Sequence, residues 1–111
     1  MATFNDWDDG VRIHVKGAPE SVLPMCVAYR AGRDERPLGD ADRAQLQSRA
    51  AALGAEGLRT MAVATRRGVA PTDPPFGELT FLGVFGLLDP PRDGVAEAIG
   101  RCHEAGIRVV M

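Results

Sequence analysis

Alternating apolar and polar residues mark the first strands of the chain. Residues 8–10, Asp-Asp-Gly, are typical of a turn, so residues 3–16 are predicted to form a β-hairpin. Successive side chains of a strand point to opposite faces. Lys16 is therefore expected to point away from the hydrophobic core, beside His14. The apolar positions that alternate with these polar ones are Val11, Ile13 and Val15.

A short helix is predicted after this hairpin. Residues 17–20, Gly-Ala-Pro-Glu, turn the chain, and Pro19 suits the first position of a helix that runs to about Ala28. Pro24 lies inside this helix and should kink or shorten it, because proline lacks a backbone N–H. Residues 30–39 combine charge, glycine and proline, which predicts an exposed loop.

A longer helix and a strand occupy the middle of the chain. Asp40 is predicted as the N-cap of a helix that ends near Ala55. Its apolar stripe is formed by Leu46, Ala50 and Leu53. Residues 58–66 form a strand candidate, with Met61 and Val63 on one face. Residues 68–77 are rich in proline and glycine and predict a loop.

The most apolar segment, residues 79–88, is predicted to be a strand that is covered on both faces. Residues 89–92, Asp-Pro-Pro-Arg, should end it, because proline cannot donate to a sheet ladder. A helix is expected from about Asp93 to Gly106. Residues 107–111 are expected to begin a further strand, as in half of a βαβ unit.

Composition indicates an ordinary globular protein. The 111 residues suit one domain, and 45% of them are hydrophobic and 25% charged. A net charge of -2 gives no basic patch for nucleic acid or anionic lipid. No apolar run approaches the roughly 20 residues that span a bilayer. The start of the chain is acidic and unlike a signal peptide. Cys26 and Cys102 have no metal-binding or redox spacing and are expected to be reduced.

Lysine occurs once, at Lys16, whereas arginine is used throughout. Chemistry that needs an ammonium group must therefore use Lys16 or the N-terminal amine. The sequence has no glycine-rich phosphate loop, and His14 and His103 are isolated. No nucleophile is paired with a base, so we assign no catalytic residue and no metal ligand.

Four segments resemble one family, the P-type cation-transporting ATPases. They occur in order and with plausible gaps, which is far more specific than any one of them alone. The branch that they resemble includes the calcium and sodium–potassium pumps. The segments are residues 16–20 (KGAPE), 57–64 (GLRTMAVA), 79–92 (LTFLGVFGLLDPPR) and 105–111 (AGIRVVM).

The resemblance implies roles for individual residues. Lys16 matches the lysine that lines the ATP pocket, and Gly17 would let the ligand approach the backbone closely. Arg59 matches an arginine that contacts the ATP phosphates, for which its guanidinium fork is suited. The hinge to the phosphorylation domain corresponds to Asp89, Pro90, Pro91 and Arg92. Taken singly, Lys16 and Arg59 also fit solvated surface residues, and residues 89–92 a turn that only ends a strand.

The chain also departs from the family pattern. The phosphorylated aspartate of DKTGT is absent, since the only lysine is followed by Gly-Ala. The family's magnesium-binding aspartates are expected beyond Met111, and its adenine-stacking aromatic before Met1. Phe4 and Trp7 lie at other positions, so that role is not transferred to them. The isolated chain is therefore expected to be inactive.

The elements and the resemblance together predict an α/β fold with a mostly antiparallel sheet flanked by helices. The expected organisation is a partial nucleotide-binding domain in residues 1–88, a hinge in residues 89–92, and the first helix and strand of a HAD-like phosphorylation domain in residues 93–111. The implied function is to position ATP, with Mg²⁺ in the parent enzyme, for phosphorylation of an aspartate outside this chain.

The implied partners are ATP and the remaining domains of the pump, on the cytoplasmic side of the membrane. We expect a soluble chain without nucleic-acid binding or direct membrane contact. Two alternatives remain open. One is a truncated, non-catalytic fragment that binds no nucleotide, and the other is an interaction module that uses exposed apolar surface.

Overall fold

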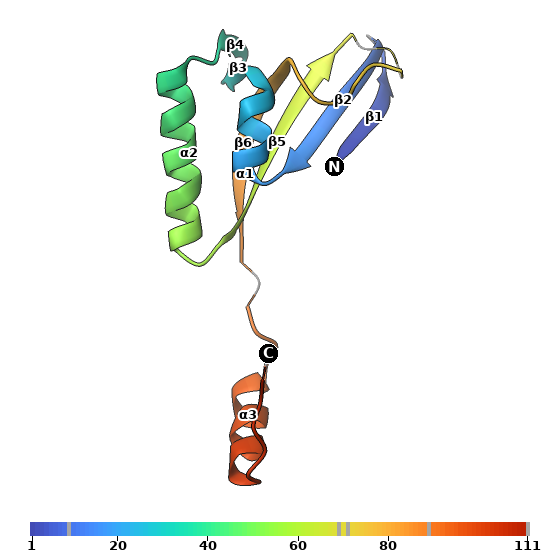
Figure 1. The fold of residues 1–111 in the computed structure, drawn as a ribbon. Helices are drawn as coiled ribbons and strands as arrows, with labels where there is room; N and C mark the ends of the chain where they lie inside the picture. The colour runs from blue at the N-terminus through green and yellow to red at the C-terminus, as the bar shows by residue number, and fades with distance from the viewer. Residues whose placement is uncertain (9, 69, 71, 89, 111) are drawn as a thin grey trace.

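The chain folds around a mixed six-stranded sheet with the strand order β1-β2-β5-β6-β3-β4 (Figure 1). A computed structural model describes residues 1–8, 10–68, 70, 72–88 and 90–110. Among these residues, β3 and β6 pair in parallel and the other neighbouring strands pair antiparallel. The expected α/β class is confirmed.

The predicted hairpin is present as β1 (Ala2–Trp7) and β2 (Gly10–Gly17). Its register places Thr3 opposite His14. The alternation expected for β2 is also confirmed, because Ile13 and Val15 are buried and Lys16 is exposed. Asp9, part of the predicted turn, lies outside the described residues.

The helix that was expected to run from Pro19 to about Ala28 is much shorter. It comprises α1 (Pro19–Val22) and one 3-10 turn, η1 (Leu23–Met25). Pro24 falls inside η1 and cannot donate the hydrogen bond that would continue an α-helix. The chain then forms the strand β3 (Cys26–Ala31), which the sequence reading missed.

The loop expected over residues 30–39 is largely a second hairpin. The end of β3 pairs with β4 (Asp34–Pro37), and the turn between them contains Gly32 at φ +65°. β4 is a short, exposed edge strand with three charged residues. Such charges are a usual protection of sheet edges, and here they gave the segment the composition of a loop.

The long helix is α2 (Asp40–Ala55). Its N-cap is Gly39, so the expected N-cap role of Asp40 was wrong by one position. Gly39 has extended backbone at φ -78° and ψ 169°, whereas Asp40 is already helical and lies in the first turn with Asp42. There the two carboxylates favour the positive end of the helix dipole.

Arg43 anchors α2 to the segment that leads into β3. Its Nη1 donates to the Leu23 carbonyl, and its Nη2 donates to the Cys26 carbonyl at 3.0 Å. One guanidinium therefore satisfies two partly buried carbonyls where the chain changes from helix to strand.

β5 (Arg59–Arg67) and β6 (Leu79–Leu87) form the centre of the sheet. β5 confirms the expected strand within one residue. β6 was expected to be covered on both faces, and this is wrong beyond its first three residues. Phe85 is 57% exposed and Leu87 is 45% exposed, because the helices cover only one face of the sheet.

The hydrophobic core lies between that covered face and α1, η1 and α2. Apolar side chains of four strands meet Val22 and Leu23 there. The strand residues of this core are Ile13, Val15, Cys26, Ala62, Ala64, Leu79 and Phe81.

The last helix, α3 (Val95–Glu104), lies away from the sheet, beyond the end of β6 (Figure 1). Gly106 follows it at φ +74°, as expected for a glycine that ends a helix. The strand expected from residue 107 is absent over residues 107–110, where no described strand lies alongside to share a ladder. Met111 is outside the described residues. None of the helices in the described part of the chain is long and apolar enough to cross a membrane.

Candidate functional site

The candidate site lies on the face of the sheet opposite α1 and α2, here called the open face. No described helix covers it (Figure 1). Residues directly opposite each other on antiparallel strands share a face. Lys16 on β2 lies opposite Val63 on β5, and both belong to the open face.

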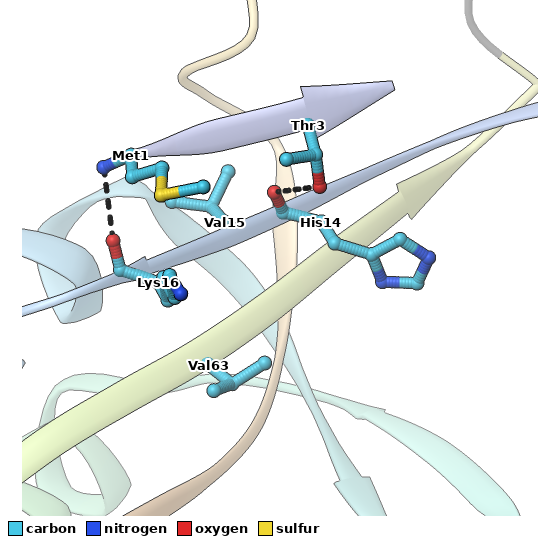
Figure 2. A pocket seen from close by; sticks show the side chains of 6 residues that line it. All are labelled: Met1, Thr3, His14, Val15, Lys16 and Val63. Atoms are coloured by element: carbon cyan, nitrogen blue, oxygen red, sulfur yellow. Dashed lines mark hydrogen bonds between the residues drawn. The ribbon is translucent and has the colours of Figure 1, made fainter. Parts of the chain in front are cut away.

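Lys16 borders a hollow of about 170 Å³ at the end of β2 (Figure 2). The hollow is formed by three neighbouring strands. Its lining residues are Met1 and Thr3 of the β1 region, His14, Val15 and Lys16 of β2, and Val63 of β5.

The backbone of Lys16 is fixed while its side chain stays exposed. The Met1 amine donates to the Lys16 carbonyl at 3.0 Å, and the Lys16 N–H donates to the Met1 carbonyl at 3.0 Å. Thr3 Oγ1 donates to the His14 carbonyl at 3.5 Å. No acidic side chain in the described part of the chain pairs with the Lys16 ammonium, which leaves its charge available to a ligand.

Arg59 begins β5 and is also exposed on the open face. The side chains of residues 59, 61 and 63 lie on the same face of β5. The register shift between β5 and β6 does not disturb this pattern, because it lies between Val63 and Ala64. Arg59 is four residues from Val63, which is about 13 Å along a strand. The sheet thus brings the two predicted cationic residues, Lys16 and Arg59, onto the same surface.

Gly17 follows Lys16 and packs against α1. A Cβ added to Gly17 would lie 3.3 Å from Val22 Cγ2, which is tighter than ordinary contact. Helix packing therefore gives a reason for glycine at this position in addition to the close approach of a ligand expected from the sequence.

The size of the hollow limits what it can hold. Small-molecule sites usually measure about 300–1,000 Å³, whereas this hollow measures about 170 Å³. A ligand of ordinary size would fill the hollow with one part only, and the remainder would extend over the open face. Arg59 does not line the hollow and lies four residues before Val63 on β5.

Several lining residues were not predicted as a group. His14 was expected beside Lys16, as observed, but Met1, Thr3 and Val63 were not assigned to the site. Strand alternation places each of them on a face. The register between β1, β2 and β5, which makes them neighbours, is fixed only in the folded sheet.

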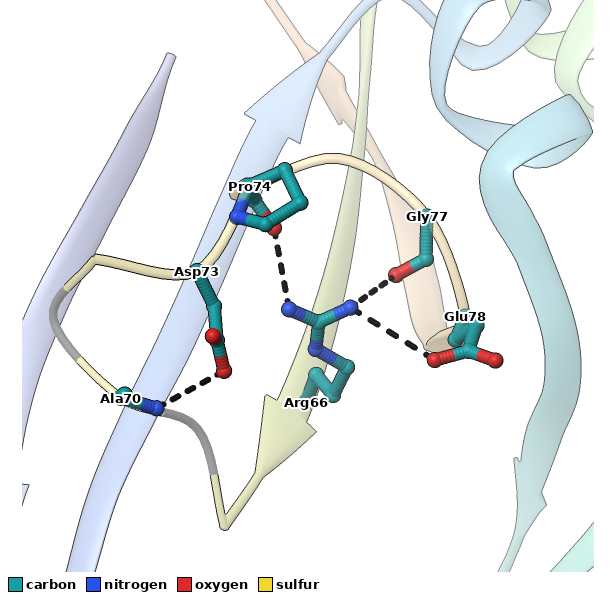
Figure 3. A network of polar contacts seen from close by, with 6 residues as sticks. All are labelled: Arg66, Ala70, Asp73, Pro74, Gly77 and Glu78. Carbon is teal, nitrogen blue, oxygen red and sulfur yellow. Dashed lines mark hydrogen bonds and ion pairs between the residues drawn. The ribbon is translucent and has the colours of Figure 1, made fainter.

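A second polar region lies at the other end of β5, where Arg66 holds the loop that leads to β6 (Figure 3). Its Nη1 donates to the Gly77 carbonyl at 3.1 Å, and its Nη2 donates to the Pro74 carbonyl at 2.9 Å. Glu78 lies 3.8 Å from the same guanidinium and has a positive φ of 51°. Arg66 thereby fixes the exit of a loop that is rich in proline and glycine.

The predicted hinge connects β6 to α3. Pro90, Pro91 and Arg92 are exposed and have no regular secondary structure, and Asp89 lies outside the described residues. Cys26 and Cys102 are free thiols, as expected. In the described ranges, no group of three or more His, Cys, Asp or Glu residues is placed to hold a metal ion.

Comparisons with known proteins assign the chain to a family. Residues 1–94 match the family described as "P-type ATPase, cytoplasmic domain N". A calcium-transporting ATPase of Plasmodium falciparum is 34% identical over 108 residues, covering 89% of this chain and 9% of the relative.

Two mammalian relatives agree. Calcium-transporting ATPase type 2C member 2 of Mus musculus is 38% identical over 105 residues, covering 94% of this chain and 10% of that protein. Calcium-transporting ATPase type 2C member 1 of Homo sapiens is 36% identical over 97 residues, covering 87% of this chain and 10% of that protein. The chain spans about a tenth of the length of these relatives. From this match and these relatives, the chain belongs to the P-type ATPases and corresponds to their cytoplasmic domain N.

Proposed function

We propose that this chain is the ATP-binding portion of a P-type cation-transporting ATPase. It would hold ATP for phosphorylation of an aspartate that lies outside the chain. The observation that carries the proposal is the presence of Lys16 and Arg59, both exposed, on the open face of the sheet. The membership of the chain in domain N of this family supports it.

The two cations suit different parts of the ligand. Lys16 supplies a compact ammonium at the hollow, and Arg59 supplies a fork of donors that matches phosphate oxygens. Between them, Val63 and Met61 give a half-buried apolar strip along β5. We infer that the base end lies in the hollow and that the phosphates extend toward Arg59. Bound Mg²⁺, when present, neutralises charge on the phosphates.

The share of this chain in the reaction is binding and orientation. The sequence contains no DKTGT aspartate, so the acceptor of the phosphoryl group must come from elsewhere in a longer pump. We propose that residues 1–88 belong to the nucleotide-binding domain and residues 93–111 to the start of the phosphorylation domain. Residues 89–92 would be the hinge. Its two prolines restrict the backbone and so limit the directions in which the chain can pass from one domain to the other.

Affinity measurements on matched variants test the proposal. Arg59→Gln should weaken ATP by about 1.5–3 kcal/mol and leave adenosine nearly unchanged, because a hydrogen bond to a charged group is lost. Lys16→Gln should weaken ATP as well. Arg49→Gln is the control, since Arg49 is exposed on α2, on the other side of the sheet. Titrations of labelled chain followed by NMR would give the affinities.

Two results would contradict the proposal. Equal weakening of ATP and adenosine by Arg59→Gln would mean that Arg59 supports the fold and not the phosphates. Equal weakening of ATP by Arg49→Gln and Arg59→Gln would mean that ATP is attracted by positive charge in general and is not bound specifically by Arg59.

A second candidate function, an interaction module without nucleotide binding, is favoured by the exposed apolar side chains of Phe85 and Leu87. It predicts that ATP causes no chemical-shift changes near Lys16 or Arg59. It also predicts that Phe85→Ser abolishes an association detectable by sedimentation.

A further inference from the structure

The two edges of the sheet differ in how well they are protected from pairing with another strand. β4 forms one edge, and three of its four residues, Asp34–Pro37, are charged and the last is proline. β1 forms the other edge (Figure 1). Its sequence, Ala-Thr-Phe-Asn-Asp-Trp, has a single charge at Asp6 and no proline. In the described part of the chain, no strand pairs with the outer side of β1, and its residues after Ala2 are exposed.

The pairing of β1 with β2 shows which backbone groups of β1 are free. Met1 and Lys16 exchange two backbone hydrogen bonds of 3.0 Å. In an antiparallel pair, such positions alternate with positions whose N–H and C=O point away from the partner strand. The Ile13 carbonyl fits this pattern, because it accepts a hydrogen bond from Thr65 on β5, at 2.9 Å, and so points away from β1. Every second residue of β1 therefore directs its backbone groups outward from the edge. These outward residues are Ala2, Phe4 and Asp6.

We propose that β1 is a self-association edge, at which two copies of the chain join their sheets through antiparallel β1 strands. The register that places Phe4 opposite Phe4 of the second copy hydrogen-bonds all three outward residues of each chain, with Ala2 opposite Asp6. Every other antiparallel register pairs at most two of the three. This inference concerns the edge of the sheet and does not depend on nucleotide binding.

The side chains of β1 fit this register. Phe4 lies opposite the core residue Ile13, so its ring is on the covered face, where it is 39% exposed. Two such rings would meet at the twofold axis and shield each other from water. On the open face, Thr3 would lie opposite Asn5 of the second copy, and both side chains can form hydrogen bonds. No like charges would meet, because Asp6 faces an alanine.

The association is expected to stop at two chains. A contact that uses the same strand of both copies is closed by its own symmetry. The edges that remain in the joined sheet are two copies of the protected β4. A contact between two short strands is small, so we expect a weak dimer with a dissociation constant of about 10 μM to 1 mM.

Charge substitutions at the twofold axis test both the edge and the register. Phe4→Lys alone and Phe4→Glu alone should each raise the dissociation constant by about 10-fold or more, because the ring pair is lost and like charges face each other. An equimolar mixture of the two variants should associate again, since opposite charges then meet at the axis. Sedimentation at several concentrations would measure each constant, and circular dichroism would verify that each variant is folded.

Phe85→Ser is the matched control for these variants. Phe85 is an exposed aromatic residue on the open face of β6, away from the β1 edge. Its substitution should leave the dissociation constant unchanged. The control separates pairing at the edge from association through the apolar side chains of the open face.

Hydrogen exchange of the original chain gives a readout that needs no substitution. The amides of Phe4 and Asp6 point outward and should exchange more slowly as the chain concentration rises through the range of association. The amides of Thr3, Asn5 and Trp7 already face β2 and should change little. This alternation along one strand is specific to pairing at its outer edge.

Four results would overturn the inference. The chain could remain monomeric at a concentration of about 1 mM, the weak end of the expected range. Phe85→Ser could abolish association while Phe4→Lys does not, which would assign the contact to the open face. The mixture of the two charged variants could stay dissociated, which would exclude the register. Slow exchange of Phe4 and Asp6 at every concentration would mean that the edge is covered within a single chain.

Discussion

At the scale of single residues, Cys26 shows how burial and charge compete. Its side chain lies in the core, where Sγ donates to the Val22 carbonyl at 3.3 Å. Burial raises the pKa of the thiol from 9.0 to about 11, and the nearby Arg43 guanidinium opposes this by favouring the thiolate. The thiol is therefore held neutral inside the fold.

The difference in the thiol pKa of Cys26 between the folded and unfolded states predicts that stability falls with rising pH in the alkaline range. The unfolded thiol ionises near 9.0, whereas the folded thiol ionises near 11. Above the lower value the unfolded state binds fewer protons than the folded state, so the free energy of unfolding decreases as pH rises. The contribution of Cys26 should be complete below about 9 and lost by about 11. Urea unfolding at several pH values would measure it.

Cys26→Ala serves as the control for this prediction. The part of the pH slope that belongs to Cys26 should be absent from this variant, so its loss of stability relative to the original chain should be largest below about pH 9 and smaller toward pH 11. A slope that persists in Cys26→Ala would assign the effect to other groups. In the unchanged chain at pH 8, a thiol reagent should modify the half-buried Cys102 faster than Cys26.

At the scale of elements, the junction of β5 and β6 depends on one glycine. A Cβ added to Gly86 would lie 2.6 Å from Leu58 Cδ1, which is closer than real Cβ contacts. Leu58 directly precedes β5 and is half-buried there. A larger residue at position 86 therefore requires the Leu58 side chain to move.

Gly86→Ala should consequently destabilise the chain by about 1–3 kcal/mol, the usual cost of overpacking. Gly83→Ala is the matched control, because it is on the same strand and its added Cβ would meet nothing within 4 Å. Denaturant unfolding of both variants would compare them. Leu58→Ala should remove most of the penalty of Gly86→Ala, and equal losses for the two glycine variants would contradict the packing explanation.

At the scale of the whole molecule, the chain is elongated. Its radius of gyration is 19.6 Å and its extents are 61 × 32 × 22 Å, whereas a compact chain of this length has a radius near 13 Å. The excess arises because α3 lies beyond the sheet (Figure 1). No residue of α3 is buried, and none belongs to the core.

Removal of α3 should therefore leave the sheet intact. A chain shortened to residues 1–92 should unfold with a free energy within about 1 kcal/mol of the original, since it loses only surface contacts. Hydrogen exchange of the original chain should show weaker protection in α3 than in β5 and β6. A shortened chain that fails to fold would show that α3 stabilises the sheet through contacts other than the core.

The sequence determined those features that depend on local pattern. The alternation of Val11, Ile13 and Val15 fixed the faces of β2, and glycine at 106 marked the end of α3, because these signals act over a few residues. The four family segments indicated the P-type ATPases, which the comparisons confirm. The residues expected to bind ATP were named on this basis, and their roles stay predictions.

Only the tertiary structure decided which elements share a surface. β3 and β4 were misread as helix and loop, because their strand state depends on pairing with β6 and with each other and not on local propensity. β6 was misread as covered on both faces, since a strand's own residues do not show how many layers pack on it. The hollow beside Lys16 depends on strand register. Register is a long-range property, set when the whole sheet forms, so the sequence named the cations of the site and the fold supplied their neighbours.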